Sequence, residues 1–170
     1  MDYRENYKLW LEEKSLDPKL RAELEAIADD PREQEERFYT ELEFGTAGLR
    51  GTMYVGLHNM NRHVIRWATQ GFANVIRAEG EEAMKKGVAI CMDCRNHSME
   101  FARAAAEVCA ANGIHVRIFE SLRPTPELSF AVREYGCIAG INITASHNPK
   151  EYNGYKVYWE DGAQLPPKHA

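Results

Sequence analysis

Two runs of almost entirely apolar residues constrain the fold of this chain more than any other feature. They are "GVAICMD" (87–93) and "CIAGINIT" (137–144). A strand with one solvent-exposed face alternates apolar and polar residues, so a continuous apolar run predicts a strand that is covered on both faces. Such strands occur in sheets that carry helices on either side. The two runs therefore predict an α/β fold.

The segments around these runs have the spacing of helices and further strands. We expect helices over 62–79, 98–111 and 126–135, and strands over 49–55, 115–120 and 154–159. Asn153 and Gly154 form a strong hairpin-turn signal, so the last strand is predicted to enter through a turn at this pair. Strands alternating with helices predict a three-layer α/β/α sandwich with a mixed, largely parallel sheet and an antiparallel final strand.

The first 44 residues are predicted to form a separate helical arm. Asp17 before Pro18 and Asp30 before Pro31 each look like an N-cap followed by proline at the first helical position. The net charge of the chain is −5, yet this arm alone carries −7. We therefore expect an arm over 1–44, with a solvated acidic face, and a mildly basic body over 45–170.

Charge and hydropathy exclude several classes of function. The weak positive charge of the body suits small phosphorylated anions and is far below the footprint of a nucleic-acid binder. No apolar run approaches the ~20 residues of a membrane helix. The N-terminus lacks the apolar core of a signal peptide. We expect a cytoplasmic protein with neither nucleic-acid nor membrane partners.

Cysteine and histidine offer a weak case for a metal site. Cys91 and Cys94 form a C-x-x-C pair, but a zinc ribbon needs a second pair, and Cys109 and Cys137 stand alone. Cys91 lies inside an apolar run, where a buried thiol is the simpler interpretation. Zinc or redox use stays open as the weaker alternative. Five histidines show no metal-ligand spacing and are interpreted as scaffold or surface residues: His58, His63, His97, His115 and His169.

Polar loops follow three of the predicted strands, at 93–98, 121–127 and 144–154. Ligands of open α/β sheets bind beyond these carboxyl ends. The first loop, "DCRNHS", is expected to cap the helix at 98 and to pair Asp93 with Arg95. A glycine-rich segment, "GTAGLRG" (45–51), places Arg50 where its guanidinium can bind a phosphate through two N–H groups. A tight turn explains the glycines of the segment equally well.

The stretch "TASHNPKEYNGYK" (144–156) is the strongest candidate site. Ser146 follows a buried strand, and Lys156 lies on the returning strand, so the hydroxyl and the ammonium can face one pocket. A serine hydrolase is the rival interpretation, but it favours a G-x-S-x-G elbow before a helix, and no helix signal follows here. Because His147 is adjacent to Ser146 in sequence, we expect its side chain to point away from the serine.

On the basis of these residues, the chain resembles the α-D-phosphohexomutase family, which includes phosphoglucomutases and phosphomannomutases. "TASHNPKEYNGYKVY" is similar to the family's phosphoserine loop, "FGTAGLRG" to its phosphate-contacting segment, and "MDCRNHS" and "RPTPEL" fall between them in the expected order. The resemblance implies a phosphoserine enzyme, an isomerase that interconverts hexose 1-phosphate and hexose 6-phosphate through a sugar bisphosphate. It also implies Mg²⁺ and a hexose bisphosphate activator such as glucose 1,6-bisphosphate.

The resemblance assigns roles residue by residue. The catalytic residues it implies are Ser146, His147, Lys156 and Arg50. The phosphate-binding residues it implies are Thr46, Gly48, Arg50, Arg95, Ser146, His147, Asn148 and Lys156. Magnesium would be held through the phosphate on Ser146 and by a D-G-D-G-D loop, which this sequence lacks.

The resemblance further implies a four-domain enzyme of which 45–170 is the first domain, so the chain alone is expected to be inactive. The abrupt, proline-rich end "LPPKHA" also suggests a domain boundary. Three alternatives stay open: a phosphopentomutase, a glucose-1,6-bisphosphate synthase, and a non-catalytic phosphosugar-binding module.

Overall fold

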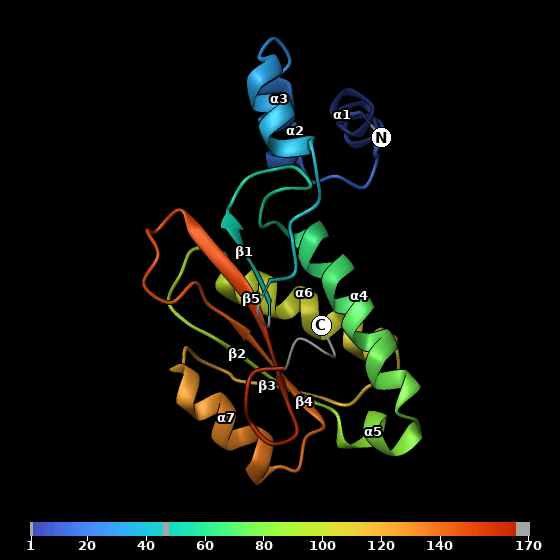
Figure 1. The fold of residues 1–170 in the computed structure, drawn as a ribbon, viewed down its shortest axis with the longest axis vertical. Coiled ribbons are helices and arrows are strands. Elements are labelled where there is room, and N and C mark those ends of the chain that lie inside the picture. The colour runs from blue at the N-terminus through green and yellow to red at the C-terminus, as the bar shows by residue number, and fades with distance from the viewer. Residues whose placement is uncertain (1, 46–47, 166–170) are drawn as a thin grey trace.

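The computed structural model describes residues 2–45 and 48–165, and these residues form a helical arm followed by an α/β sandwich (Figure 1). Within the described residues the sheet has the strand order β1-β5-β4-β2-β3. The strands are β1 (Gly48–Thr52), β2 (Val88–Met92), β3 (Val116–Ile118), β4 (Ala139–Ile143) and β5 (Tyr152–Trp159).

The central strands β2 and β4 are buried at every residue, as their apolar runs predict. They pair in parallel, and β3 also runs parallel to β2. β5 is antiparallel to both β4 and β1, so β1 points in the same direction as β4. The predicted mixed, largely parallel sheet with an antiparallel final strand is therefore confirmed.

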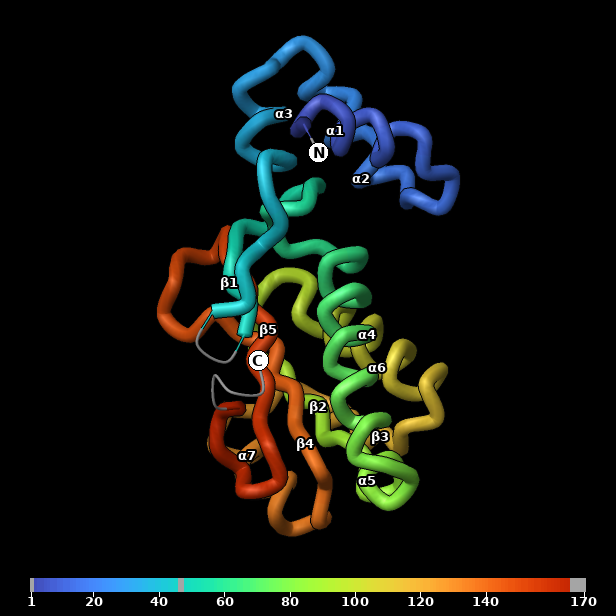
Figure 2. The backbone as a smooth tube through the Cα atoms, turned by 45° about the vertical axis from the view of Figure 1, so that its right-hand side comes forward, coloured from blue at the N-terminus to red at the C-terminus, as the bar shows by residue number. Residues whose placement is uncertain are grey.

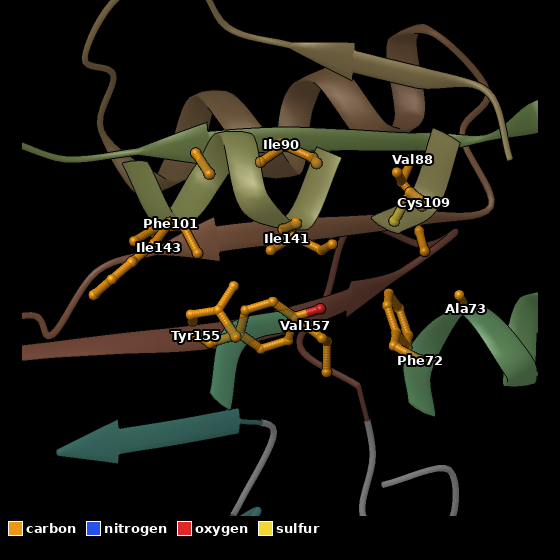
Figure 3. Close-up of a cluster of buried hydrophobic side chains, with 14 of the residues drawn as sticks. Phe72, Ala73, Val88, Ile90, Phe101, Cys109, Ile141, Ile143, Tyr155 and Val157 are labelled. Atoms are coloured by element: carbon orange, nitrogen blue, oxygen red, sulfur yellow. The ribbon is translucent and has the colours of Figure 1, made fainter. Parts of the chain in front are cut away.

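Helices cover both faces of the sheet, which confirms the three-layer sandwich. On one face lie α4 (Arg62–Ala78) and α6 (Ser98–Ala111), with the short α5 (Glu81–Lys86) beside them (Figure 1). Their apolar side chains meet those of the strands in one large core, where Tyr155 and Val157 of β5 contact Ile141 and Ile143 of β4 (Figure 3). On the opposite face α7 (Thr125–Glu134) packs Leu128 on Ala89 and Cys91.

The arm contains α1 (Tyr3–Glu12), α2 (Pro18–Ala26) and α3 (Pro31–Phe38), which lie beyond one end of the sheet (Figure 2). Asp17 and Asp30 each accept hydrogen bonds from backbone amides of the first helical turn, with proline at its start, as predicted. Phe38 is completely buried in a small core of the arm. The arm is fixed to the body, since Val55 N–H donates to the Glu23 carboxylate over 2.9 Å. The division at residue 44 stays a prediction.

The predicted hairpin turn at Asn153 and Gly154 is wrong, because both residues lie inside β5. The chain turns earlier, over 146–151. A Cβ atom at Gly154 would lie 2.6 Å from the carbonyl oxygen of Thr144 and 2.9 Å from that of Leu49, so close strand packing explains the glycine. The buried side-chain amide of Asn153 donates to Asn96 O and to Ser98 Oγ, so long-range contacts explain the asparagine.

Smaller differences concern element ends. β1 ends at Thr52 and not at residue 55, and β3 is limited to Val116–Ile118. The helices over 62–79, 98–111 and 126–135 are confirmed to within one residue at each end. Within the described ranges no helix is long and apolar enough to span a membrane.

Candidate active site around Ser146

The polar loops that follow β2 and β4 meet at one edge of the sheet. The last residues of these strands, Met92 and Ile143, are paired in register, so the segments after them start side by side. The segment 121–127 reaches the same edge, since Arg123 N–H donates to Met92 O over 3.1 Å. The structure thus gathers the three predicted loops where ligands of α/β sheets bind.

Ser146 is exposed and has a left-handed backbone conformation with φ +58°. Its N–H donates to the hydroxyl of Thr144 over 3.1 Å, and Asn148 N–H donates to Ala145 O over 3.1 Å. Left-handed conformations are uncommon for residues other than glycine, and they concentrate at functional sites where surrounding contacts hold them. The serine is therefore presented by a tightly bonded turn.

His147 does not point away from Ser146, and that expectation is wrong. The Nδ1 atom of His147 and the Oγ atom of Ser146 lie 3.1 Å apart. Adjacent side chains point in opposite directions in an extended strand, but here the left-handed residue turns the chain. The serine hydrolase remains disfavoured, because Ser146 precedes a turn and β5 and not a helix.

Arg50 connects β1 to the serine loop. One of its Nη atoms donates to the side-chain oxygen of Asn148 over 3.0 Å. Gly48 precedes it, and a Cβ atom there would lie 2.1 Å from Tyr155 O, so β1 approaches β5 as closely as a glycine permits. Of the predicted phosphate-binding residues, Thr46 lies outside the described residues.

Lys156 is paired in register with Gly48, and both line a pocket of about 380 Å³. Arg50 and Glu43 line the same pocket, and no sequence pattern singled out Glu43. Burial, and then the charge of Arg50, lower the pKa of Lys156 below its ordinary value of 10.5. Among the described residues neither cation has a carboxylate within ion-pair distance. With two cations and one carboxylate, the lining formed by the described residues has net positive charge and suits an anion. Ser146 is not part of this lining, so the predicted shared pocket of Ser146 and Lys156 stays a prediction.

Arg95 turns toward the backbone of the serine loop. Its Nη atoms donate to the carbonyl oxygens of Ser146 and Asn148, each over 2.8 Å, and of Pro149 and Tyr152, over 2.9 and 3.0 Å. The expected pairing with Asp93 is confirmed, with Arg95 Nε 3.8 Å from the carboxylate. The predicted binding of a substrate phosphate by Arg95 stays a prediction.

The expected side-chain cap of the helix at 98 is wrong. The N-cap residue is His97, whose backbone is left-handed and whose side chain makes no capping hydrogen bond. Asp93 instead accepts from the backbone amide of Arg95 and from the hydroxyl of Ser98. The carboxylate thus organises the loop itself.

The structure agrees with the interpretation of Cys91 as a buried thiol. All four are free thiols, and Cys91 is buried and donates to Arg123 O. Burial raises the pKa of the Cys91 thiol to about 11, which disfavours the thiolate that binds metals. The side chains of His58, His63 and His97 contact neighbouring aromatic rings, with His63 against Trp10 as one example.

The comparisons with known proteins agree on one family. The family profile described as "Phosphoglucomutase/phosphomannomutase, alpha/beta/alpha domain I" matches residues 41–170. The human phosphopentomutase is 43% identical over 150 residues, covering 84% of this chain and 24% of that protein. A phosphoglucomutase of Staphylococcus haemolyticus is 46% identical over 132 residues, covering 78% and 24%. The chain thus spans about a quarter of the length of these relatives.

Solved structures show the same likeness in three dimensions. A Thermus thermophilus protein assigned as a phosphomannomutase superposes with a TM-score of 0.69 at 29% identity, covering 77% of this chain and 28% of that one. A phosphoglucomutase/phosphomannomutase family protein of Burkholderia thailandensis gives a TM-score of 0.58 at 26% identity, covering 72% and 27%.

Proposed function

Because the chain belongs to the phosphoglucomutase/phosphomannomutase family, we propose that it supplies the phosphoryl-carrying serine of a sugar-phosphate mutase. The observation that carries the proposal is the geometry at Ser146. An exposed hydroxyl on a left-handed turn has the imidazole of His147 3.1 Å away, and Arg50 is hydrogen-bonded to the same turn. Such a turn presents a hydroxyl to a substrate while cations nearby offset phosphate charge.

The proposed reaction moves one phosphoryl group out and another back. The phosphoserine at Ser146 donates its phosphoryl group to a free hydroxyl of a sugar monophosphate, so the bond from phosphorus to Oγ breaks and a bond to the sugar oxygen forms. The sugar hydroxyl loses its proton, and the serine oxygen gains one. After the resulting bisphosphate has reoriented, its other phosphate returns to the serine by the reverse step.

Two side chains are candidates for moving these protons. His147 is within hydrogen-bond reach of the serine oxygen, which suits an acid and base at the enzyme end of the transferred group. Lys156 has a lowered pKa, which makes it a better proton donor than an ordinary lysine. In its protonated form it is also a cation for phosphate. We propose that His147 exchanges a proton with the serine oxygen. Lys156 and Arg50 offset the negative charge of the phosphoryl group.

Magnesium remains part of the proposal, with most of its ligands outside this sequence. Residues 2–45 and 48–165 contain no group of three or more histidine, cysteine, aspartate or glutamate side chains placed to hold a metal. This chain would therefore contribute a phosphate oxygen on Ser146. A bound magnesium ion would neutralise charge on the phosphoryl group.

The substrate is proposed to be a hexose monophosphate, with glucose 1,6-bisphosphate as activator. A pentose phosphate is the alternative, because phosphopentomutases and phosphoglucomutases match the chain with similar identity, 43% and 46%. Glucose-1,6-bisphosphate synthesis is a further alternative on the same chemistry. We propose that other segments of a longer protein complete the substrate site, that 1–170 alone does not turn over substrate, and that the protein is cytoplasmic.

The test is phosphorylation of the full natural protein that carries this chain. After incubation with magnesium and glucose 1,6-bisphosphate, intact mass and peptide mapping should find one phosphoryl group on the 144–156 peptide. Ser146→Ala should lose it, while Ser121→Ala, which removes another exposed serine near the same sheet edge, should keep it. The same incubation is repeated with a ribose bisphosphate as donor. If the wild-type protein stays unmodified with both donors, the result would favour the non-catalytic binding module.

A further inference from the structure

We propose that Arg95, supported by Asp93 and Thr144, is a positioning residue that holds Ser146 in its reactive conformation. The inference rests on the proposed function, since it concerns the rate at which Ser146 gives and takes a phosphoryl group. It differs from the role that the family resemblance implies for Arg95, which is contact with a substrate phosphate. The structure points to a contact with the enzyme's own backbone.

The guanidinium of Arg95 is surrounded by the loop that carries the serine. Its Nη atoms donate to the carbonyl oxygens of Ser146, Asn148, Pro149 and Tyr152 at 2.8–3.0 Å. The side chain is only 11% exposed. Because every Nη hydrogen bond that it makes within the described part of the chain ends on this loop, little donor capacity is left for a phosphate.

A second group of contacts fixes the start of the loop. Asp93 accepts from the hydroxyl of Thr144, and that hydroxyl accepts in turn from the N–H of Ser146. Asp93 also accepts from the backbone N–H of Arg95 and lies beside its Nε. The carboxylate therefore links the arginine to the amide of the serine, and both ends of the left-handed residue are held.

Such support is what the backbone of Ser146 requires. A non-glycine residue with φ +58° is strained by roughly 1–3 kcal/mol and persists where its surroundings hold it. Without the carbonyl contacts the turn is free to relax, and the Oγ atom moves relative to Arg50 and Lys156. A displacement of about 1 Å of a reacting group can slow a reaction by roughly 100-fold.

Lysine cannot replace arginine in this role. A planar guanidinium offers a rigid fork of N–H groups that reaches several carbonyl oxygens at once, whereas an ammonium is a compact charge on a flexible stem. Arg95→Lys therefore keeps the positive charge and loses the planar fork. A loss in kcat then indicates a positioning role, whereas a loss in KM alone indicates direct phosphate binding.

The experiment compares Arg95→Lys, Thr144→Val and the control Arg103→Lys in the full natural protein, with Tm measured for each. Arg103 is an exposed arginine of α6. Wild-type phosphorylation and turnover are measured first, because their absence would refute the proposed function on which the inference rests, whereas a result confined to the variants tests the inference itself. For Arg95→Lys and Thr144→Val we expect kcat, and the single-turnover rate of Ser146 phosphorylation, to fall by about 100-fold, with KM changed by less than about threefold.

Two results would overturn the inference. One is a kcat in either variant within about threefold of the wild type at unchanged Tm. The other is a loss in Arg95→Lys that appears in KM alone, which would return the arginine to direct phosphate binding. If Arg95→Lys is poorly folded, Thr144→Val decides, because it removes the hydroxyl contact to the Ser146 amide and leaves the arginine in place.

Discussion

Replacing Gly154 tests the part of the fold that positions the candidate site. A Cβ atom there would lie 2.6 Å from Thr144 O and 2.9 Å from Leu49 O, so the backbones of both neighbouring strands would have to move. Overpacking costs about 1–3 kcal/mol, and the upper half of this range, about 2–3 kcal/mol, applies where rigid backbone is the obstacle. At about 2–4 °C per kcal/mol for a chain of this size, Gly154→Ala should lower Tm by roughly 4–12 °C.

The matched control is Gly71→Ala. Gly71 is an exposed residue of α4, and a Cβ atom there would meet nothing within 4 Å. Alanine is favoured over glycine inside a helix by about 1 kcal/mol, so this change should raise Tm by roughly 2–4 °C. Melting curves of both variants by calorimetry, at one pH and salt concentration, would show shifts of opposite sign.

A third variant, Gly154→Asn, distinguishes the strand from the hairpin turn that the sequence suggested. Asparagine tolerates the left-handed conformation of a turn, so a turn at this position would accept it almost without loss. In the strand, its larger side chain meets the same two carbonyl oxygens and should cost at least as much as alanine. A Gly154→Asn protein with wild-type Tm would refute the reasoning.

Three further predictions concern other parts of the chain. Because the pKa of Lys156 is lowered on folding, the unfolded state binds more protons than the folded state between that pKa and 10.5. The Tm of the wild type should therefore rise with pH through this window. The rise should be smaller in Lys156→Met. In native protein a thiol reagent should modify Cys94 rapidly and the three buried thiols after denaturation, whereas equal rates for all thiols would contradict the burial. Phe38→Ala should destabilise the arm by about 3–5 kcal/mol, while Phe130→Ala, at a side chain 60% exposed, should cost α7 far less. Hydrogen exchange of α1 and α3 measures the first effect, and that of α7 measures the second.

The sequence predicted the order and type of most elements because their signals are local. Continuous apolar runs identified β2 and β4, and the aspartate–proline pairs identified the starts of α2 and α3. The same locality explains the error at Asn153 and Gly154. A turn signal depends on neighbouring residues, whereas the packing of Gly154 depends on Thr144 and Leu49, which are distant in sequence.

The candidate site shows the same division between local sequence signals and contacts of distant residues. The sequence alone determined that Ser146 follows a buried strand, that Lys156 lies on the strand after the serine loop, and that Arg50 lies in a glycine-rich segment, because residue type and spacing are enough for these inferences. The tertiary structure decided the conformation of Ser146, its approach to His147, and the contacts of Arg95 with the serine loop. The contacts of Arg95 join residues 51–57 positions apart, and strand pairing across the sheet, which no local pattern encodes, brings them together.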